Sequence, residues 1–310
     1  MKKNIVVVGC GYWGKNLVRN FHELDALYGV SDPQTEISEL YSKKYSVKSL
    51  SFNESLKDKN VDAVAICAPA ELHKKLIIEA LLNGKNVFVE KPLALSLNEC
   101  DEIEEALTSS KKFLMVGHLL HYHPIFSKVK KLIKSNEIGK VLKIHSERKS
   151  FGKIRNNEDV IWSFAPHDIS MILSLADSMP DDIKVSGNYF LDQKIYDSAN
   201  INLTFKGNLS AQIDVSWLHP VKRHCLTIIG EKGMIVFDDT NDWPEKLFLR
   251  KHSLNNELAL NSADKFIEVP YGEPLKIECS HFLDLLDGNV ENITDFNEGK
   301  KVVSVLCRCS

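Results

Sequence analysis

The sequence predicts an α/β protein in which a doubly wound parallel sheet comes first and a mostly antiparallel sheet follows. As far as about residue 117, short apolar segments alternate with segments of helical spacing, which is typical of parallel strands joined by helices. Beyond about residue 141 the apolar segments are longer and are separated mainly by turns. A chain of 310 residues is long enough for two cores. We therefore predict two domains, residues 1–119 and residues 120–310.

Charge and composition argue against several classes of partner. The 39 Lys and Arg residues nearly balance the 42 Asp and Glu residues, so no basic field is available for a nucleic acid. No apolar stretch approaches the length of a membrane span. The seven cysteines are scattered, and no two pairs have the spacing of a zinc site. We expect a protein of the reducing cytoplasm that binds no nucleic acid, no membrane and no metal.

The expected elements follow from the apolar spacing. In the first domain the strands are residues 5–8, 27–30, 61–67, 86–90 and 113–116, and the helices are 15–24, 37–45, 72–82 and 98–109. In the second domain the helices are 124–134, 166–175, 275–287 and 297–307, and the strands are 141–149, 183–191, 199–205, 209–216, 225–229 and 234–238. Pro166 would then begin a helix and place His167 and Asp168 in its first turn.

Gly9, Gly11 and Gly14 follow the first strand and form the pattern G-x-G-x-x-G at the start of a helix. In a dinucleotide-binding turn the first glycine makes the tight turn, the second admits the pyrophosphate, and the third lets helix and strand pack closely. The helix N-terminus then offers free N–H groups to the phosphates. Three spaced glycines also occur in ordinary strand-to-helix turns, so the surrounding pattern decides.

Asp32 provides that context. It follows the second strand and lies 32 − 14 = 18 residues beyond the last glycine, about where a carboxylate reaches the adenosine ribose hydroxyls. A carboxylate there repels a 2′-phosphate, so we predict NAD rather than NADP as the cofactor. The remaining cofactor-binding candidates lie in the glycine turn or soon after later strands, where open α/β sheets present ligands: Tyr12, Trp13, Pro69, His73, Glu90 and Lys91.

Lys91 is the first candidate for catalysis, because Glu90-Lys91-Pro92 stands at the carboxyl end of a buried strand. A lysine that is partly desolvated beside a nicotinamide cation can exchange protons as a general acid or base. The alternative is an ordinary surface lysine. His167 is the second candidate, and its alternative is a structural histidine. His118, His121 and His123, which flank Tyr122, lack a matching carboxylate or cysteine pattern for a metal, and we expect them to line a polar pocket.

These motifs, in this order and spacing, resemble those of the Gfo/Idh/MocA oxidoreductase family over essentially the whole chain. The resemblance implies an N-terminal Rossmann domain and a C-terminal α/β domain with an open, mostly antiparallel sheet. It implies a substrate held between the domains, Lys91 and His167 facing the nicotinamide, and homodimers or homotetramers formed through the sheets.

A narrower likeness is carried by Trp162-Ser-Phe-Ala-Pro-His-Asp-Ile169, by Ser216-Trp-Leu-His-Pro220 and by residues 152–155. These stretches resemble the branch that acts on nucleotide sugars in bacterial surface polysaccharide biosynthesis, lipopolysaccharide included. The best-known members of that branch oxidise C3 of UDP-N-acetylglucosaminuronate. One departure is Ser163, which stands where the family commonly has an aspartate four residues before the histidine. Asp168 cannot replace it, because adjacent helical residues point about 100° apart.

The leading hypothesis is therefore an NAD-dependent nucleotide-sugar 3-dehydrogenase with Lys91 and His167 as catalytic residues. One alternative is a ketoreductase of the same family that works in the opposite direction. Another is a non-catalytic NAD-binding sensor on the same fold. The substrate-binding candidates are Lys91, Tyr122, Arg148, Lys153, Arg155, His167 and Asp168. Arginines suit diphosphate and carboxylate groups, although a solvated loop would also explain the basic segment from Arg148 to Arg155.

Overall fold

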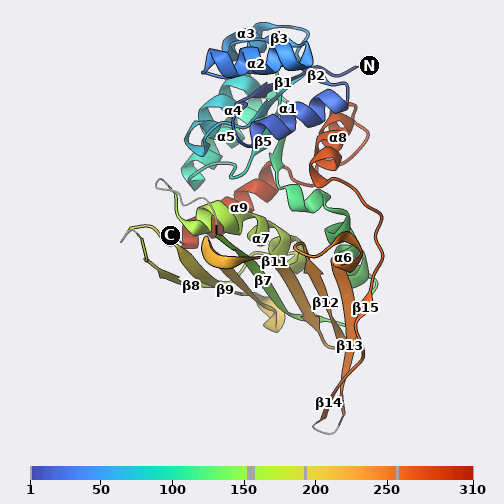
Figure 1. Cartoon of the computed structure of the whole chain (residues 1–310). Coiled ribbons are helices and arrows are strands. Elements are labelled where there is room, and N and C mark those ends of the chain that lie inside the picture. The colour runs from blue at the N-terminus through green and yellow to red at the C-terminus, as the bar shows by residue number, and fades with distance from the viewer. Residues whose placement is uncertain (1, 152–157, 192–193, 256–257, 310) are drawn as a thin grey trace. The chain divides into compact units, whose positions relative to one another are not determined.

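The computed structural model describes residues 2–151, 158–191, 194–255 and 258–309 (Figure 1). The chain forms two compact units: residues 1–119 with 273–307, and residues 120–272 with 308–310. The first division falls at the boundary that the sequence predicts. Residues 273–307 differ from the prediction, because they belong to the first unit rather than to the second.

The first unit contains a six-stranded sheet in which all the paired strands are parallel. Its order β3-β2-β1-β4-β5-β6 is that of a Rossmann fold, and the predicted doubly wound sheet is confirmed. Every residue of β1 and β4 is buried, as expected for strands that helices cover on both faces. The strands are β1 Ile5–Val8, β2 Leu27–Ser31, β3 Lys48–Ser49, β4 Ala63–Ile66, β5 Asn86–Glu90 and β6 Leu114–Gly117.

Two helices of the first unit, α3 and α5, begin with a serine cap. For example, Ser51 accepts a hydrogen bond from the backbone of Glu54, whose carboxylate accepts one in return, so that α3 starts with a capping box. The α-helices are α1 Gly14–Glu23, α2 Thr35–Tyr45, α3 Phe52–Lys57, α4 His73–Leu82, α5 Leu97–Ser110, α8 Pro274–Leu286 and α9 Phe296–Cys309. The short 3₁₀ turns η1 Ala70–Leu72 and η2 Leu119–Tyr122 precede α4 and follow β6.

The rings around Phe282 explain why the C-terminal helices join the first unit. Phe282 of α8 is fully buried and makes edge contacts with Phe21 of α1, Phe88 of β5 and Phe113, with ring centroids 6.2, 5.7 and 5.7 Å away. Figure 1 shows α8 beside α1. Burying a phenylalanine side chain contributes about 1.5–3 kcal/mol, so this contact ties the end of the chain to its beginning.

The second unit contains a nine-stranded sheet, in which β7 and β10 are parallel and the other paired strands are antiparallel. The prediction of a mostly antiparallel sheet is confirmed. The sequence missed the last three strands, of which β13 carries the basic residues Arg250, Lys251 and His252 in its middle. The strands are β7 Val141–Phe151, β8 Asp182–Asn188, β9 Ser198–Thr204, β10 Ser210–Ser216, β11 Leu218–Gly230, β12 Gly233–Asp238, β13 Leu247–Asn255, β14 Leu258–Asn261 and β15 Lys265–Phe266.

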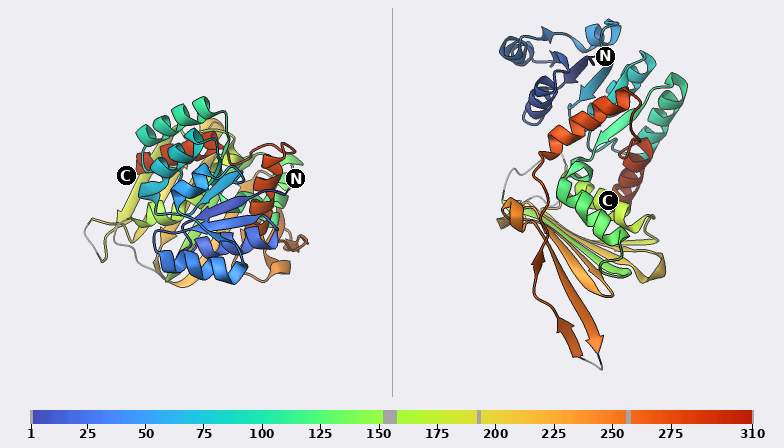
Figure 2. Two further views of the ribbon diagram at one scale, coloured as in Figure 1. Left: turned by 90° about the horizontal axis from the view of Figure 1, so that it is seen from above. Right: turned by 90° about the vertical axis from the view of Figure 1, so that its right-hand side faces the viewer.

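Two helices of the second unit, α6 Pro124–Lys134 and α7 Val160–Ala176, lie against the same face of this sheet (Figure 2). The 3₁₀ turns η3 Lys206–Asn208 and η4 Trp243–Glu245 lie between strands. No helix among the described residues is long and apolar enough to cross a membrane.

Helix α7 corrects one expectation. It begins at Val160, where the Asp159 carboxylate caps it by accepting the backbone N–H of Trp162 at 3.0 Å. Pro166 lies inside the helix, so His167 and Asp168 are in its third turn instead of its first. The aspartate cap, rather than the proline, decides where this helix starts.

Candidate functional site

The glycine turn after β1 is packed as a dinucleotide-binding turn requires. Gly9 has a φ of +88°, and a Cβ on it would lie 2.7 Å from the carbonyl oxygen of Cys67. A Cβ on Gly14 would lie 1.9 Å from the carbonyl oxygen of Gly9. Only glycine fits at either position, and the result is a close approach of β1, α1 and the chain after β4 at the point where the strand order reverses.

The open side of this turn has the form that a dinucleotide needs. A Cβ on Gly11 would meet no atom within 4 Å, and no side chain caps α1 at its N-terminus, which leaves the positive end of the helix facing the turn. Asp32 stands beside the turn: its carboxylate accepts the backbone N–H groups of Cys10 and Gln34 at 2.8 and 2.9 Å. Gly11 and Asp32 therefore fit a bound dinucleotide.

Glu90 and Trp13 connect the glycine turn to the end of β5. The indole N–H of Trp13 donates to Glu90 at 2.5 Å, and Glu90 is almost fully buried. Burial raises the pKa of Glu90 to about 7, and the hydrogen bond from Trp13 and the charge of Lys91 oppose this rise. Lys91 follows Glu90 directly at the end of β5, and its peptide bond to Pro92 is cis. Tyr12, in contrast, is 87% exposed.

His73 connects the segments that follow β4 and β5. Its ring nitrogens lie 2.7 Å from the carbonyl oxygen of Pro92 and 2.9 Å from that of Ala68. Burial lowers the pKa of His73. The imidazole thus joins the chain after β4, where Pro69 precedes η1, to the chain after β5. Its contact with a cofactor stays a prediction, whereas its role between the two loops is visible.

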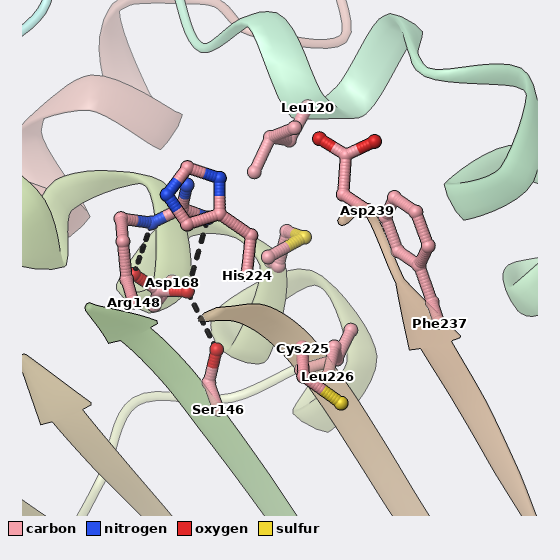
Figure 3. Close-up of a pocket in the computed structure, with 10 residues that line it drawn as sticks. Leu120, Ser146, Arg148, Asp168, His224, Cys225, Leu226, Phe237 and Asp239 are labelled. Atoms are coloured by element: carbon pink, nitrogen blue, oxygen red, sulfur yellow. Dashed lines mark hydrogen bonds and ion pairs between the residues drawn. The ribbon is translucent and has the colours of Figure 1, made fainter. Parts of the chain in front are cut away.

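In the second unit, Arg148 and Asp168 form a buried ion pair that joins β7 to α7 (Figure 3). The guanidinium donates to the Asp168 carboxylate at 2.7 and 3.2 Å, and the Ser146 hydroxyl donates to it at 2.5 Å. Both carboxylate oxygens are therefore engaged inside the unit. The substrate contacts expected of Arg148 and Asp168 stay predictions, and what the pair visibly does is to hold the helix that carries His167.

His224 lies over this ion pair in the same small cavity (Figure 3). Burial, and after it the charges of Arg148 and Lys222, lower the pKa of His224 to about 4. The imidazole is thus uncharged near neutral pH. No sequence motif had indicated His224 or Ser146, because both occupy positions within strands.

The three clustered histidines bind different partners. The ring of His118 bonds to Glu298, His121 lies 2.8 Å from the Ser170 hydroxyl, and His123 lies 3.4 Å from an oxygen of Asp239. Tyr122 is buried beside them. Within the described ranges, no group of three or more histidine, cysteine or acidic residues is arranged to hold a metal ion.

Two of the predicted site residues, Lys153 and Arg155, lie outside the described residues. One residue that the sequence analysis missed is Glu278 of α8, which is fully buried. It stands on the same helical face as the apolar residues Leu275 and Phe282. A carboxylate on the apolar face of a helix was the signal that could have identified it.

Two family models match the chain. The Gfo/Idh/MocA oxidoreductase model, described as an NAD-binding Rossmann fold, matches residues 3–118. The model of the Gfo/Idh/MocA C-terminal domain matches residues 126–236. The chain belongs to the Gfo/Idh/MocA family. It is an NAD-binding oxidoreductase, and the resemblance seen in the glycine turn, Asp32 and the Glu90-Lys91-Pro92 motif is confirmed.

Relatives with assigned names differ in what they act on. A 2,7-anhydro-N-acetylneuraminate hydratase of Mediterraneibacter gnavus is 28% identical over 75% of this chain and 66% of its own length. A myo-inositol 2-dehydrogenase of Thermotoga maritima is 27% identical over 77% of this chain and 76% of its own length. The solved structure of the UDP-N-acetylglucosamine 3-dehydrogenase GnnA of Acidithiobacillus ferrooxidans has a TM-score of 0.87 at 20% identity, covering 100% of this chain and 97% of that one. At this identity the structural likeness shows the fold.

Proposed function

We propose that the protein transfers hydride between C3 of a nucleotide sugar resembling UDP-N-acetylglucosaminuronate and NAD. The observation that carries the proposal is the placement of Lys91 directly after the buried Glu90, whose carboxylate Trp13 ties to the glycine turn. The lysine thereby stands at the edge of the sheet where an α/β fold presents its cofactor. A role in bacterial surface polysaccharide biosynthesis belongs to the same proposal.

Each residue has a defined part in this chemistry. Bound NAD supplies the acceptor of the hydride. Lys91, in its neutral form, takes the proton of the sugar hydroxyl, so that an O–H bond breaks and an N–H bond forms at Nζ. His167 orients the sugar, and α7, which carries it, is held on β7 by the pair of Arg148 and Asp168. In the reverse direction the same groups return the proton, so a ketoreductase is the same site working backwards.

The nucleotide-sugar assignment is supported by the Trp162–Ile169 stretch and by the activity for which the structural neighbour GnnA is named. A second candidate is oxidation of a free cyclitol, which the name of the Thermotoga relative favours. A sensor without catalysis is a weaker explanation, because the chain retains both Lys91 and His167. A homodimer or homotetramer remains part of the proposal, and light scattering of the purified chain measures it.

The test is NADH absorbance of the purified protein with NAD and a panel of UDP-sugars, dTDP-sugars, free hexoses and inositols. We expect NADH to form with a UDP-sugar, and with the UDP-N-acetylglucosaminuronate type best. NADH formation with an inositol or free hexose and with no nucleotide sugar would replace the proposal by the second candidate. No change with any substrate, in either direction, would favour the sensor.

A further inference from the structure

Glu278 is a charged residue in the core of the first unit that the proposed function does not yet use. Its side chain is completely buried, and neither carboxyl oxygen has a hydrogen-bond partner among the residues that the structure describes. An isolated carboxylate in such a place is strongly unfavourable, because burial without hydrogen bonds costs the solvation of the charge. A residue retained at this cost is a candidate for function.

The packing of α8 on β5 places Glu278 toward Glu90. Phe282 follows Glu278 by four residues and so lies on the same face of α8. Phe88 precedes Glu90 by two residues and so points to the same side of β5. The rings of Phe282 and Phe88 touch, with centroids 5.7 Å apart, which brings the two carboxyl groups to the same layer of the core. The negative charge of Glu90 adds to burial in raising the pKa of Glu278.

The two carboxyl groups differ in the hydrogen bonds that they accept. Glu90 accepts the indole N–H of Trp13 and the backbone N–H of Lys91, both of which stabilise its ionised form. Glu278 accepts none among the described residues. Burial raises the pKa of Glu278 well above its usual range and that of Glu90 to about 7, so the pair keeps a proton, and that proton belongs on Glu278.

Other groups near the pair are few among the described residues. Lys91 and His118 act on Glu90, and the Cys67 thiol lies in the field of Glu90. Cys279 is next to Glu278 and is also within the fields of Arg19 and Glu273. Burial raises the pKa values of the Cys67 and Cys279 thiols, so both remain uncharged near neutral pH.

We propose that Glu278 is a positioning residue which stays protonated under Glu90, so that the end of β5 holds one negative charge beneath Lys91 instead of two. The inference rests on the proposed function, in which Lys91 is the acid or base. A single charge at Glu90 anchors Trp13 and the Lys91 backbone. A second charge at Glu278 would stabilise the ammonium form of Lys91 and keep it from accepting the sugar proton.

Infrared spectroscopy of the full chain tests the protonation state without any substrate. At about pH 9 Glu90 is ionised, and we expect a carbonyl band of a protonated carboxylic acid to remain in the wild type. Glu278→Gln should remove the band. The control is Asp284→Asn, which removes a carboxyl from an exposed position of the same helix and should leave the band in place. Absence of the band from the wild type would overturn the inference, even if neither variant folds.

Unfolding by urea gives a second readout. Because folding raises the pKa of Glu278, its contribution to stability is fully present below the usual glutamate pKa and is lost as the pH rises through the folded value. The wild type should therefore lose stability toward alkaline pH more steeply than Glu278→Gln or the similarly sized Glu278→Met. Parallel curves for the wild type and both variants would contradict a protonated Glu278.

Turnover tests the link to Lys91. The ratio of kcat near pH 7 to kcat at a pH above that at which the infrared band disappears should be larger for the wild type than for Glu278→Gln, by up to about tenfold, because the charge then formed at Glu278 shifts the pKa of Lys91 by about one unit. The KM for NAD should change with pH equally in the wild type and in Glu278→Gln. Equal ratios with the infrared band present would remove Glu278 from the reaction. If no substrate is turned over, the proposed function fails while the infrared and urea results still decide the protonation of Glu278.

Discussion

Replacing Arg148 with methionine distinguishes a structural role of this side chain from a substrate-binding role. The sequence placed Arg148 among the substrate contacts, whereas the structure joins it to Asp168 through two hydrogen bonds. The side chains of Arg148 and Asp168 are only 12% and 1% exposed. The variant removes the cation and leaves the Asp168 carboxylate buried, with the Ser146 hydroxyl as its remaining donor in the set described above.

The expected loss follows from that burial. Removing one partner of a buried ion pair costs about 3–5 kcal/mol, and the hydrogen bond from Ser146 places this case near the lower end, at about 3 kcal/mol. The double variant Arg148→Met with Asp168→Asn should recover about 1–2 kcal/mol of this loss, because it removes the stranded charge. Breaking an exposed ion pair would lower the unfolding free energy by only about 0–1 kcal/mol.

Urea unfolding followed by tryptophan fluorescence measures this effect. Of the four tryptophans, only Trp13 lies in the first unit, so the signal reports mainly on the second. The matched control is Arg250→Met, which breaks a similar two-bond pair with Asp264 at the surface, where the side chains are 36% and 33% exposed. The control should lose about 1 kcal/mol or less.

The reasoning is refuted if Arg148→Met is as stable as Arg250→Met. If, in addition, the KM for the sugar substrate rises while stability is unchanged, Arg148 is a substrate-binding residue, as the sequence had suggested. If Arg148→Met changes neither the stability nor the KM for the sugar, Arg148 has neither the structural nor the substrate-binding role.

Three further outcomes are expected. Lys91→Met should lower kcat by a factor of about 10² to 10⁴, the usual effect of losing an acid or base, and its NAD affinity should stay within a few-fold of the wild type. Near-normal turnover in an NADH assay would exclude Lys91 from proton transfer. Asp32→Ser should narrow the preference for NAD over NADP measured by fluorescence titration, and wild-type binding of NADPH equal to that of NADH would contradict the assignment of Asp32. Phe282→Ala should lower the unfolding free energy of the first unit by about 3–5 kcal/mol in thermal or urea unfolding. The control Ile277→Ala, at an exposed position of the same helix, should lower it by about 1 kcal/mol or less. Equal losses would show that α8 does not belong to that core.

The sequence was informative wherever the deciding signal is local. Four consecutive apolar residues identify β1 and three spaced glycines identify the turn, because each signal depends on neighbours along the chain. The aspartate at a fixed distance predicts the ribose contact in the same way. Local signals can also compete. Pro166 suggested a helix start, but the Asp159 cap and the apolar residues after it start α7 earlier.

Contacts between distant segments were decided only by the tertiary structure. Whether Arg148 meets a substrate or Asp168 depends on how α7 lies on β7, and the two residues are twenty positions apart. The burial of Glu278 depends on α8 returning to the sheet formed by the first part of the chain. By itself the sequence determined the family, the parallel sheet and the cofactor turn, since periodicity and spacing are written along the chain. Which charges are buried and which are paired was decided by the fold, because the free energy of a charge depends on the groups that surround it in space.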